Sequence, residues 1–427
     1  MKTKLVIFGI TGDLSTRKLL PALEQIMSTG DFDDLSVIGV SRRDLDINNL
    51  LRSSLGSTEL VDRFSSFSMD VSQPDDYRAL KDYIALGDDE QALIYLSVPP
   101  GASAQIVELL GQAGINTPNV KLMLEKPFGV DLSSARQMID HVGRYYNDAH
   151  VYRIDHYLAK EMSQNIIAFR GGNALFEHVW SKDAVEKIEV NALESIGIEG
   201  RAEFYEQTGA LRDVVQGHLM QLLAVTLMDI PRDFDWENVM GLRLDALNEL
   251  RPADPVQAVR GQYIGYCDEV KNPDTTVETF ASITLESTSD KWQGVPIILS
   301  SGKSMDRKVT EVRVHFKKTH EAQTNCLVFR IQPHEGVEIE LFTKKPGYDR
   351  SFQNKTLSFE YPEETKLPDA YEQVIVDAIR SDKSLFATSS EVIRSWELLN
   401  PVQQHWSMRA DDLIHYDPGV DLYTLLA

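Results

Sequence analysis

The first 150 residues alternate between short apolar runs and amphipathic stretches, and this rhythm constrains the fold more than any other feature. The apolar runs predict buried strands at residues 4–9, 35–40, 93–97 and 120–124. Residues 14–27 have the pattern of an amphipathic helix, and Pro21 predicts that this helix starts late or bends. Strands that alternate with helices in this way are typical of a doubly wound, mostly parallel sheet. We therefore expect an α/β domain over residues 1–150.

The rhythm changes after about residue 150, where longer strands with period-two alternation take over. These strands are predicted at residues 186–193, 262–266, 277–286, 309–316 and 326–332. Long helices separate them, the clearest at residues 209–228. Residues 151–427 are therefore expected to form an α+β domain around a large sheet that is mainly antiparallel.

Composition and charge exclude several classes of protein. Hydrophobic residues make up 42% of the 427, enough for a large buried core, and no apolar run approaches the length of a membrane span. The two cysteines, Cys267 and Cys326, offer neither a disulfide framework nor a metal motif, so a cytoplasmic protein without a metal is expected. The net charge of −22 opposes binding to nucleic acid. Any site for a phosphorylated ligand must therefore gather its positive charge locally.

A glycine-containing turn follows the first predicted strand. It reads Gly9-Ile10-Thr11-Gly12-Asp13-Leu14, and glycines at a strand-to-helix turn let the backbone approach a pyrophosphate at the helix N-terminus. The spacing differs from GxGxxG, so a plain glycine turn is an alternative, and no Gly-Lys-Ser/Thr follows as in an NTPase phosphate loop. The pattern favours a Rossmann-type dinucleotide site.

Two arginines follow the second predicted strand, where a Rossmann domain binds the adenosine ribose. An acidic residue there would bind the free hydroxyls of NAD, whereas arginine suits a 2′-phosphate. Here Arg42 and Arg43 precede Asp44. A charged surface turn is the alternative, but the position relative to the glycine turn favours NADP over NAD.

Three further segments carry a family resemblance. They read Glu125-Lys126-Pro127-Phe128-Gly129, Arg153-Ile154-Asp155-His156-Tyr157-Leu158-Ala159-Lys160-Glu161, and Gly209-Ala210-Leu211-Arg212-Asp213-Val214-Val215-Gln216-Gly217-His218-Leu219. Together with the glycine turn they resemble the signature segments of the glucose-6-phosphate dehydrogenase family. The RIDHYxxKE block is highly specific to that family, and the resemblance covers nearly the whole chain. It implies NADP-dependent oxidation of glucose 6-phosphate to 6-phosphogluconolactone in the oxidative pentose phosphate pathway, by a homodimer or homotetramer.

The resemblance also assigns roles to individual residues. It implies that His218 is the general base and that Asp155 is its partner, although a lone histidine on an apolar helix face is more often a core residue. The implied cofactor-binding residues are Gly9, Thr11, Gly12, Asp13, Leu14, Arg42 and Lys126. The implied substrate-binding residues are Lys126, His156, Tyr157, Lys160, Glu194, Asp213, Lys303 and Lys308, of which His156, Tyr157 and Lys160 would hold the 6-phosphate. The Lys126–Pro127 bond can be cis or trans.

The chain departs from the family pattern at a few positions. Gly217 stands where the family usually has Asn, Ser300 where an arginine is common, and the tail after Asp417 is short. Two alternative functions remain. A sugar dehydrogenase of the glucose–fructose oxidoreductase type shares the Rossmann domain and the EKP turn but lacks the RIDHYxxKE block. A catalytically inactive NADP-binding sensor would have lost the catalytic pair, which is intact here.

Overall fold

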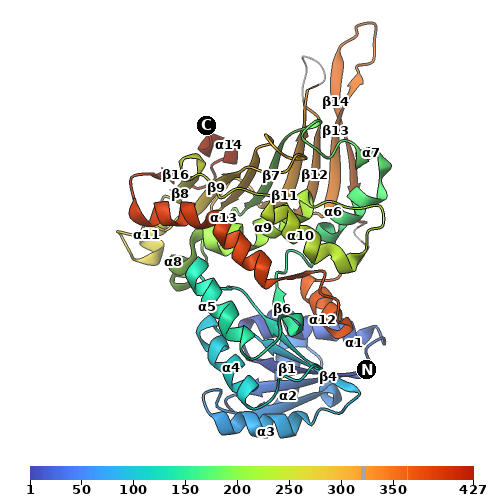
Figure 1. Ribbon diagram of the computed structural model, residues 1–427, viewed down its shortest axis with the longest axis vertical. Helices are drawn as coiled ribbons and strands as arrows, with labels where there is room; N and C mark the ends of the chain where they lie inside the picture. The colour runs from blue at the N-terminus through green and yellow to red at the C-terminus, as the bar shows by residue number, and fades with distance from the viewer. Residues whose placement is uncertain (319–323, 363) are drawn as a thin grey trace. The chain divides into compact units, whose positions relative to one another are not determined.

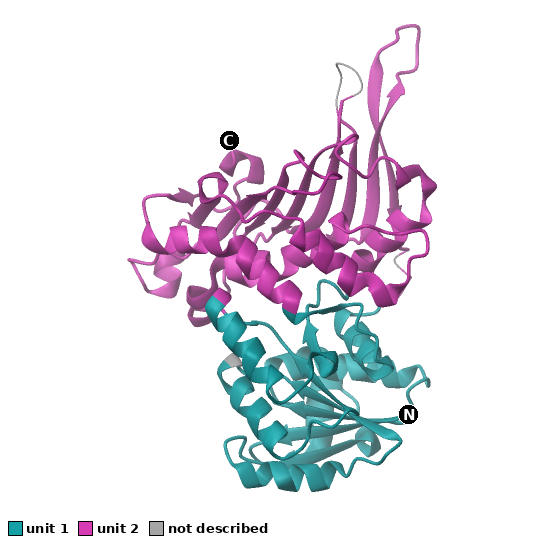
Figure 2. Ribbon diagram, in the orientation of Figure 1, with its two compact units in different colours: residues 1–129, 133–159, 368–389 teal, residues 130–132, 160–367, 390–427 magenta. Residues whose placement is uncertain are grey.

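The computed structural model describes residues 1–318, 324–362 and 364–427, and its chain divides into two compact units (Figure 2). The first unit comprises residues 1–129, 133–159 and 368–389, and the second comprises residues 130–132, 160–367 and 390–427. This division differs from the boundary predicted at residue 150. Residues 151–154 extend the first sheet by one strand, and residues 368–389 return to pack against it.

The first unit is built on a seven-stranded sheet with the order β15-β6-β5-β4-β1-β2-β3. Figure 1 labels β1, β4 and β6 of this sheet. Its first six strands in chain order are parallel, and β15 pairs antiparallel with β6. The strand bounds are β1 Lys2–Phe8, β2 Leu35–Ser41, β3 Phe64–Ser68, β4 Glu90–Leu96, β5 Val120–Leu124, β6 Val151–Ile154 and β15 Phe386–Ala387. The sheet order reverses between β1 and β4, which places a topological switch point at the carboxyl end of β1.

Helices cover both faces of this sheet. The bounds are η1 Ser15–Leu19, α1 Leu20–Ser28, α2 Ile47–Leu55, η2 Val61–Arg63, α3 Pro74–Ile84, α4 Pro100–Gln112, α5 Leu132–Gly143, η3 Asp148–His150 and α12 Ala370–Arg380. Helices α1, α2 and α12 share one apolar core with β1. The Phe8 ring of β1 instead stacks on the Tyr77 ring of α3, with 6.4 Å between the ring centroids. The predicted effect of Pro21 is confirmed, because Pro21 lies in the first turn of α1, directly after the π-helical turn η1.

The second unit is built on a nine-stranded sheet with the order β14-β13-β12-β11-β7-β10-β9-β8-β16. Two neighbouring pairs, β7–β10 and β8–β16, are parallel, and the other pairs are antiparallel. The bounds are β7 Val185–Leu193, β8 Val259–Tyr263, β9 Phe280–Leu285, β10 Ile297–Gly302, β11 Val309–Phe316, β12 Cys326–Gln332, β13 Gly336–Lys344, β14 Phe352–Glu360 and β16 Leu413–Tyr416. The predicted fold class, a doubly wound domain followed by a mainly antiparallel α+β domain, is confirmed.

The helices of the second unit include a π-helical segment, η4, which carries the predicted site residues Asp213 and His218. The bounds are α6 Glu161–Gly172, α7 Ala174–Glu177, α8 Ala202–Ala210, η4 Leu211–Leu219, α9 Met220–Leu227, η5 Trp236–Asn238, α10 Val239–Asn248, η6 Pro255–Gln257, α11 Tyr266–Val270, α13 Ser389–Met408 and α14 Leu422–Leu425. The single helix predicted at residues 209–228 is corrected in two ways. Gly209 is not helical, with φ 61° and ψ 180°, and η4 is a π-helix.

The described residues contain no helix with the length and apolarity that crossing a membrane requires. Within the same ranges, no group of three or more His, Cys, Asp or Glu side chains is arranged to hold a metal ion.

Candidate active site

The turn after β1 brings backbone unusually close to the neighbouring strand end. Gly9 has φ +79°, and a Cβ atom there would lie 2.2 Å from the main-chain oxygen of Ser97. Gly12 N–H donates to the Gly9 carbonyl at 2.9 Å, and the Ser15 hydroxyl donates to the same carbonyl at 3.0 Å. Only glycine at position 9 satisfies both the backbone conformation and the close approach.

A cavity of about 650 Å³ opens beside this turn. Four of the predicted cofactor-binding residues line it, namely Gly9, Thr11, Gly12 and Arg42, and Arg43 lies next to them. An apolar wall completes it, formed by Val40, Leu45, Val71, Val98, Pro99, Ala102 and Ile106. A bare glycine turn and an apolar wall fit the pyrophosphate and the adenine of a dinucleotide, and the two arginines beside them are exposed.

Two predicted cofactor residues do not line this cavity. Asp13 is exposed and forms an ion pair with Arg17 at 2.7 Å. Leu14 packs against the apolar core of the first unit. Both belong to the helix start, so their side chains point away while their positions still define the turn.

A second group of predicted residues gathers where β5 and β6 end. Lys126 Nζ lies 3.9 Å from Asp155 Oδ2, and the Lys126–Pro127 peptide is cis. Asp155 is buried, and its Oδ1 accepts the Tyr157 N–H at 3.0 Å. The His156 ring lies over that of Tyr371 at 6.2 Å with nearly parallel planes. The first unit thus places a cation, a buried carboxylate and an imidazole at one edge of its sheet.

Glu125 and Tyr95 lie beneath this group and were not predicted as site residues. The Tyr95 hydroxyl donates to Glu125 Oε1 at 2.5 Å. Burial raises the pKa of Glu125 to about 7, an effect that the Tyr95 hydrogen bond opposes and the Asp155 charge reinforces. The position of Glu125 in the EKP segment was the available signal, whereas nothing local marks Tyr95.

The second unit holds another charged pair. Lys303 Nζ forms an ion pair with Glu194, and both follow strands that pair in parallel, β10 and β7. Lys303 is buried, and its Nζ lies 5.3 Å from the centre of the Tyr205 ring. The main chain locks the pair, because Glu194 N–H donates to the Gly302 carbonyl at 2.9 Å. The structure thus brings Glu194 and Lys303 together, and their predicted roles in binding a substrate remain predictions.

The remaining predicted residues occupy three places in the second unit. Asp213 and His218 lie on η4, where Asp213 is half-buried and His218 buried. Lys160 precedes α6. Burial raises the pKa of Glu335, and the Lys160 charge opposes this effect. Lys308 lines a cavity of about 470 Å³ together with Arg307, Arg313 and Arg330.

The predicted pair of Asp155 and His218 is divided between the units, Asp155 in the first and His218 in the second. The same holds for the predicted phosphate-binding group, with His156 and Tyr157 in the first unit and Lys160 in the second. These pairings remain predictions.

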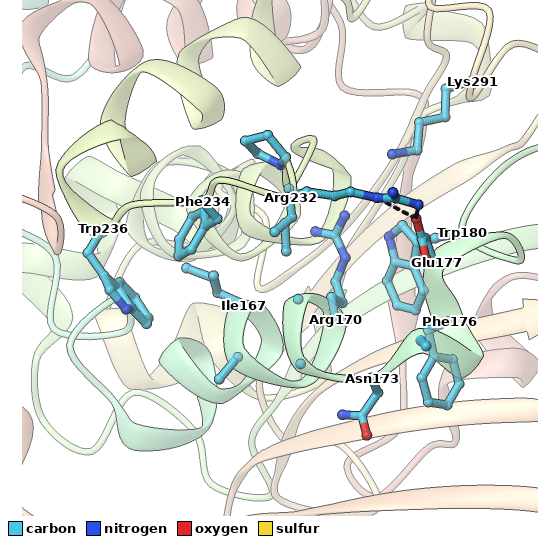
Figure 3. A pocket seen from close by; sticks show the side chains of 16 residues that line it. Ile167, Arg170, Asn173, Phe176, Glu177, Trp180, Arg232, Phe234, Trp236 and Lys291 are labelled. Atoms are coloured by element: carbon cyan, nitrogen blue, oxygen red, sulfur yellow. Dashed lines mark hydrogen bonds and ion pairs between the residues drawn. The ribbon is translucent and has the colours of Figure 1, made fainter.

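A further cavity of about 520 Å³ lies at the carboxyl end of α6 and contains none of the predicted site residues (Figure 3). Its buried Arg170 donates to the carbonyls of Val225 at 2.8 Å and Met228 at 2.6 Å, and lies over the Trp180 ring. Arg232 binds Glu177 at its mouth at 2.9 Å. Arg170 therefore caps the end of α9, which gives this cavity a structural role.

Comparison with known proteins decides the family. Residues 6–165 match the NAD binding domain of glucose-6-phosphate dehydrogenase, and residues 167–421 match the C-terminal domain of the same family. This chain belongs to the glucose-6-phosphate dehydrogenase family. Among curated relatives, the glucose-6-phosphate 1-dehydrogenase of Gluconobacter oxydans is 34% identical, over 97% of this chain and 93% of its own. That of Borreliella burgdorferi is 33% identical, over 94% and 92%.

A solved structure extends the family match to three dimensions. It is a glucose-6-phosphate dehydrogenase in complex with its substrate glucose 6-phosphate, 28% identical, with a TM-score of 0.91 over 100% of this chain and 97% of that one. The family's dinucleotide-binding domain implies a nicotinamide cofactor, and the cavity beside Gly9 lies within the matched domain.

Proposed function

We propose that this protein oxidises glucose 6-phosphate at its anomeric carbon, with NADP⁺ as the hydride acceptor, to give 6-phosphogluconolactone. The observation that carries the proposal is the presence of both family domains across nearly the whole chain, with Asp155 and His218 in place. The residues of the cavity beside Gly9 fit the dinucleotide, and when bound, the cofactor supplies the hydride acceptor.

The chain's own residues would handle the proton. His218 would take the proton of the anomeric hydroxyl, because a neutral imidazole is a suitable base near pH 7. Asp155 would fix the imidazole tautomer and stabilise the imidazolium that forms. Its buried position and the hydrogen bond from Tyr157 N–H hold its carboxylate in one orientation.

Recognition of the substrate would use charge gathered locally in a chain of net charge −22. His156, Tyr157 and Lys160 would bind the 6-phosphate. Glu194 and Asp213 would accept hydrogen bonds from sugar hydroxyls, with Lys126, Lys303 and Lys308 supplying positive charge around the sugar. The ion pair between Glu194 and Lys303 supports this assignment, because it fixes the carboxylate that would face the hydroxyls.

Arg42 supports NADP⁺ over NAD⁺. It lines the cavity together with Arg43, directly after the strand that precedes the ribose position. A guanidinium is always charged and binds phosphate through two donors, so it favours the 2′-phosphate.

The proposal includes a homodimer or homotetramer in the cytoplasm. The edge strand β14 carries exposed apolar side chains, with Phe352 59% and Leu357 58% exposed, which supports pairing with a second copy. Neither Cys267 nor Cys326 forms a disulfide, in keeping with a reducing compartment.

The test is absorbance at the NADPH band with purified protein, in four combinations of NADP⁺ or NAD⁺ with glucose 6-phosphate or glucose. Rapid reduction is expected only with NADP⁺ and the phosphorylated sugar. Equal rates with glucose would favour the glucose–fructose oxidoreductase alternative, and no reduction in any combination would favour the inactive sensor. Light scattering of the same sample would reveal a monomer if the assembly proposal is wrong.

A further inference from the structure

The helical segment that carries Asp213 and His218 starts where the helical backbone is interrupted. Gly209, next to last in α8, has φ +61° and interrupts the helical backbone, so a new helical segment begins at Ala210. The first N–H groups of such a segment have no partners within the helix. Here the segment continues as the π-helix η4, whose register places both functional residues.

Glu278 supplies the partners that these N–H groups lack. Its carboxylate Oε1 accepts the Leu211 N–H at 3.0 Å, and its main-chain oxygen accepts the Ala210 N–H at 2.9 Å. Glu278 is 6% exposed and lies in the chain leading into β9, 67 positions from Leu211. It therefore caps the start of the η4 segment from a distant part of the chain.

Gly209 and Glu278 fit each other closely. A Cβ atom at position 209 would lie 2.4 Å from Glu278 Oε1, so any side chain there would displace the carboxylate. Arg212, two positions after Ala210, reaches back to the Thr208 carbonyl at 3.4 Å and thereby satisfies the end of α8. The interruption is thus stabilised on both sides.

The residue after Glu278 connects the same point to the sugar-binding half of the site. The Thr279 main-chain oxygen accepts the Lys303 N–H at 2.9 Å, and the Thr279 N–H donates to the Gly261 carbonyl at 2.8 Å. The Tyr205 ring lies under the Lys303 ammonium. The dipeptide Glu278-Thr279 therefore fixes both the start of η4 and the backbone of Lys303.

We propose that Glu278 is a positioning residue for catalysis, which sets the register of the helix carrying Asp213 and His218 by holding the Leu211 N–H. This inference rests on the proposed function for its kinetic consequence, but its structural part is independent of any activity. The hydrogen bond from the Leu211 N–H requires the length of the Glu278 side chain rather than its charge. Burial raises the pKa of Glu278, against the hydrogen bond from Leu211 and the charges of Arg212 and Arg260, so a neutral acceptor of the same length should serve.

Three substitutions separate reach from charge. Glu278→Gln keeps the reach and an acceptor oxygen, Glu278→Asp keeps the charge but is one methylene shorter, and Glu278→Ala removes both. The turnover number with glucose 6-phosphate should fall about tenfold or more in the Asp and Ala variants and stay within about threefold in the Gln variant. The NADP⁺ dissociation constant should be unchanged in all three, because the cavity beside Gly9 belongs to the other unit. The matched control is Glu286→Ala at the other end of β9, an exposed carboxylate 3.6 Å from Arg251, which should keep wild-type turnover.

Amide hydrogen exchange over residues 211–219 gives a readout independent of chemistry. Exchange should accelerate in the Asp and Ala variants, and not in the Gln or Glu286→Ala variants. Should Glu278→Ala fail to fold, the comparison of Asp with Gln decides. Wild-type turnover and exchange in the Asp variant would overturn the proposal, as would equal losses in the Gln and Asp variants. A wild-type protein inactive on glucose 6-phosphate would refute the proposed function alone, since the exchange pattern would still test the cap.

Discussion

The two units hold their functional residues in different ways. In the first unit, a local turn places the residues: Gly12 N–H and the Ser15 hydroxyl both bind the Gly9 carbonyl within six positions of chain. In the second unit, partners are far apart in sequence, with 109 positions between Glu194 and Lys303 and 67 between Leu211 and Glu278. The difference teaches that the glycine turn of the first unit is encoded by local pattern, and the charged and capping contacts of the second unit by tertiary packing.

The largest expected effect tests whether the two units work as one at the chemical step. His218→Asn should lower the turnover number by about 10²–10⁴, because the amide cannot act as a general base. Asp155→Asn should also slow turnover, because its amide cannot stabilise the imidazolium as a carboxylate does. The measurement is turnover at saturating glucose 6-phosphate and NADP⁺ for both single variants and the double variant.

The double variant decides the interpretation. If Asp155 acts through His218, the losses should not multiply, since the pair works as one unit. Multiplicative losses would mean that the residues of the two units act independently, and the proposed pair would have to be abandoned. A loss confined to the Michaelis constant would instead mark His218 as a binding residue.

The same contrast explains how much of the fold could be predicted from the sequence. The bounds of β5, β11 and β12 match the predicted strands residue for residue, because each is a continuous or alternating apolar run. The strand β13 was not predicted, although Val337, Ile339 and Leu341 alternate there with Glu338 and Glu340. The strand β14 was not predicted either, and its side chains are exposed along most of its length. The boundary near residue 150 missed α12, which joins the first unit from more than 200 positions away, as the hydrogen bond from Lys121 to Ala378 illustrates.

The candidate site follows the same rule. Gly9, Thr11, Gly12 and Arg42 could be placed at one cavity because they follow adjacent strand ends. The interruption at Gly209 could not be predicted, because the Glu278 carboxylate that lies against it comes from a distant part of the chain. The strand predicted at residues 277–286 included Glu278, whereas β9 starts only at Phe280. The prediction therefore gave Glu278 the place of a strand residue and not of a helix cap.

The second prediction concerns cofactor choice in the first unit. Arg42→Ala should weaken NADP⁺ binding by about 10- to 150-fold and leave NAD⁺ nearly unchanged, because it removes a charge-assisted contact to the 2′-phosphate alone. Dissociation constants for both cofactors, measured by fluorescence titration, check this. The matched control is Arg78→Ala, an exposed arginine paired with Asp75 on α3, which should change neither. An equal loss of affinity for both cofactors would show that Arg42 does not contact the 2′-phosphate.

The third prediction carries the comparison to the second unit, to which Lys160 belongs. Lys160→Ala should raise the Michaelis constant for glucose 6-phosphate by about tenfold, because one ammonium contact to the phosphate is lost. Unphosphorylated glucose, where it reacts at all, should be nearly unaffected. Lys182→Ala, in the turn before β7, is the control for charge alone and should leave both constants unchanged. A Lys160→Ala variant that keeps its full preference for the phosphorylated sugar would contradict the assignment.

The smallest expected effect sharpens the comparison, because it concerns α12, a helix that the first unit takes from a distant part of the chain. Asp377 on α12 is buried, and its Oδ1 accepts a hydrogen bond from Gln373 at 2.7 Å. Its Oδ2 has no hydrogen-bond partner among the described residues. Burial raises the pKa of Asp377 to about 7, and the neighbouring Asp382 charge adds to this effect, while Arg380 opposes it.

A raised folded-state pKa stabilises the fold at low pH, and this contribution is lost as pH rises from the ordinary value near 4 through about 7. Asp377→Asn removes the titration, so the variant should exceed wild-type stability by about 1–2 kcal/mol at pH 8 and match it near pH 4. Thermal unfolding followed by circular dichroism at the two pH values measures the difference. The five tryptophans all lie in the second unit. If α12 stabilises the first unit alone, the unfolding midpoint followed by tryptophan fluorescence should therefore shift less than the midpoint followed by circular dichroism. Asp75→Asn, an exposed carboxylate on α3, should leave both midpoints nearly unchanged. A gain in stability for Asp377→Asn that is equal at both pH values would show that burial of the charge is not its cause.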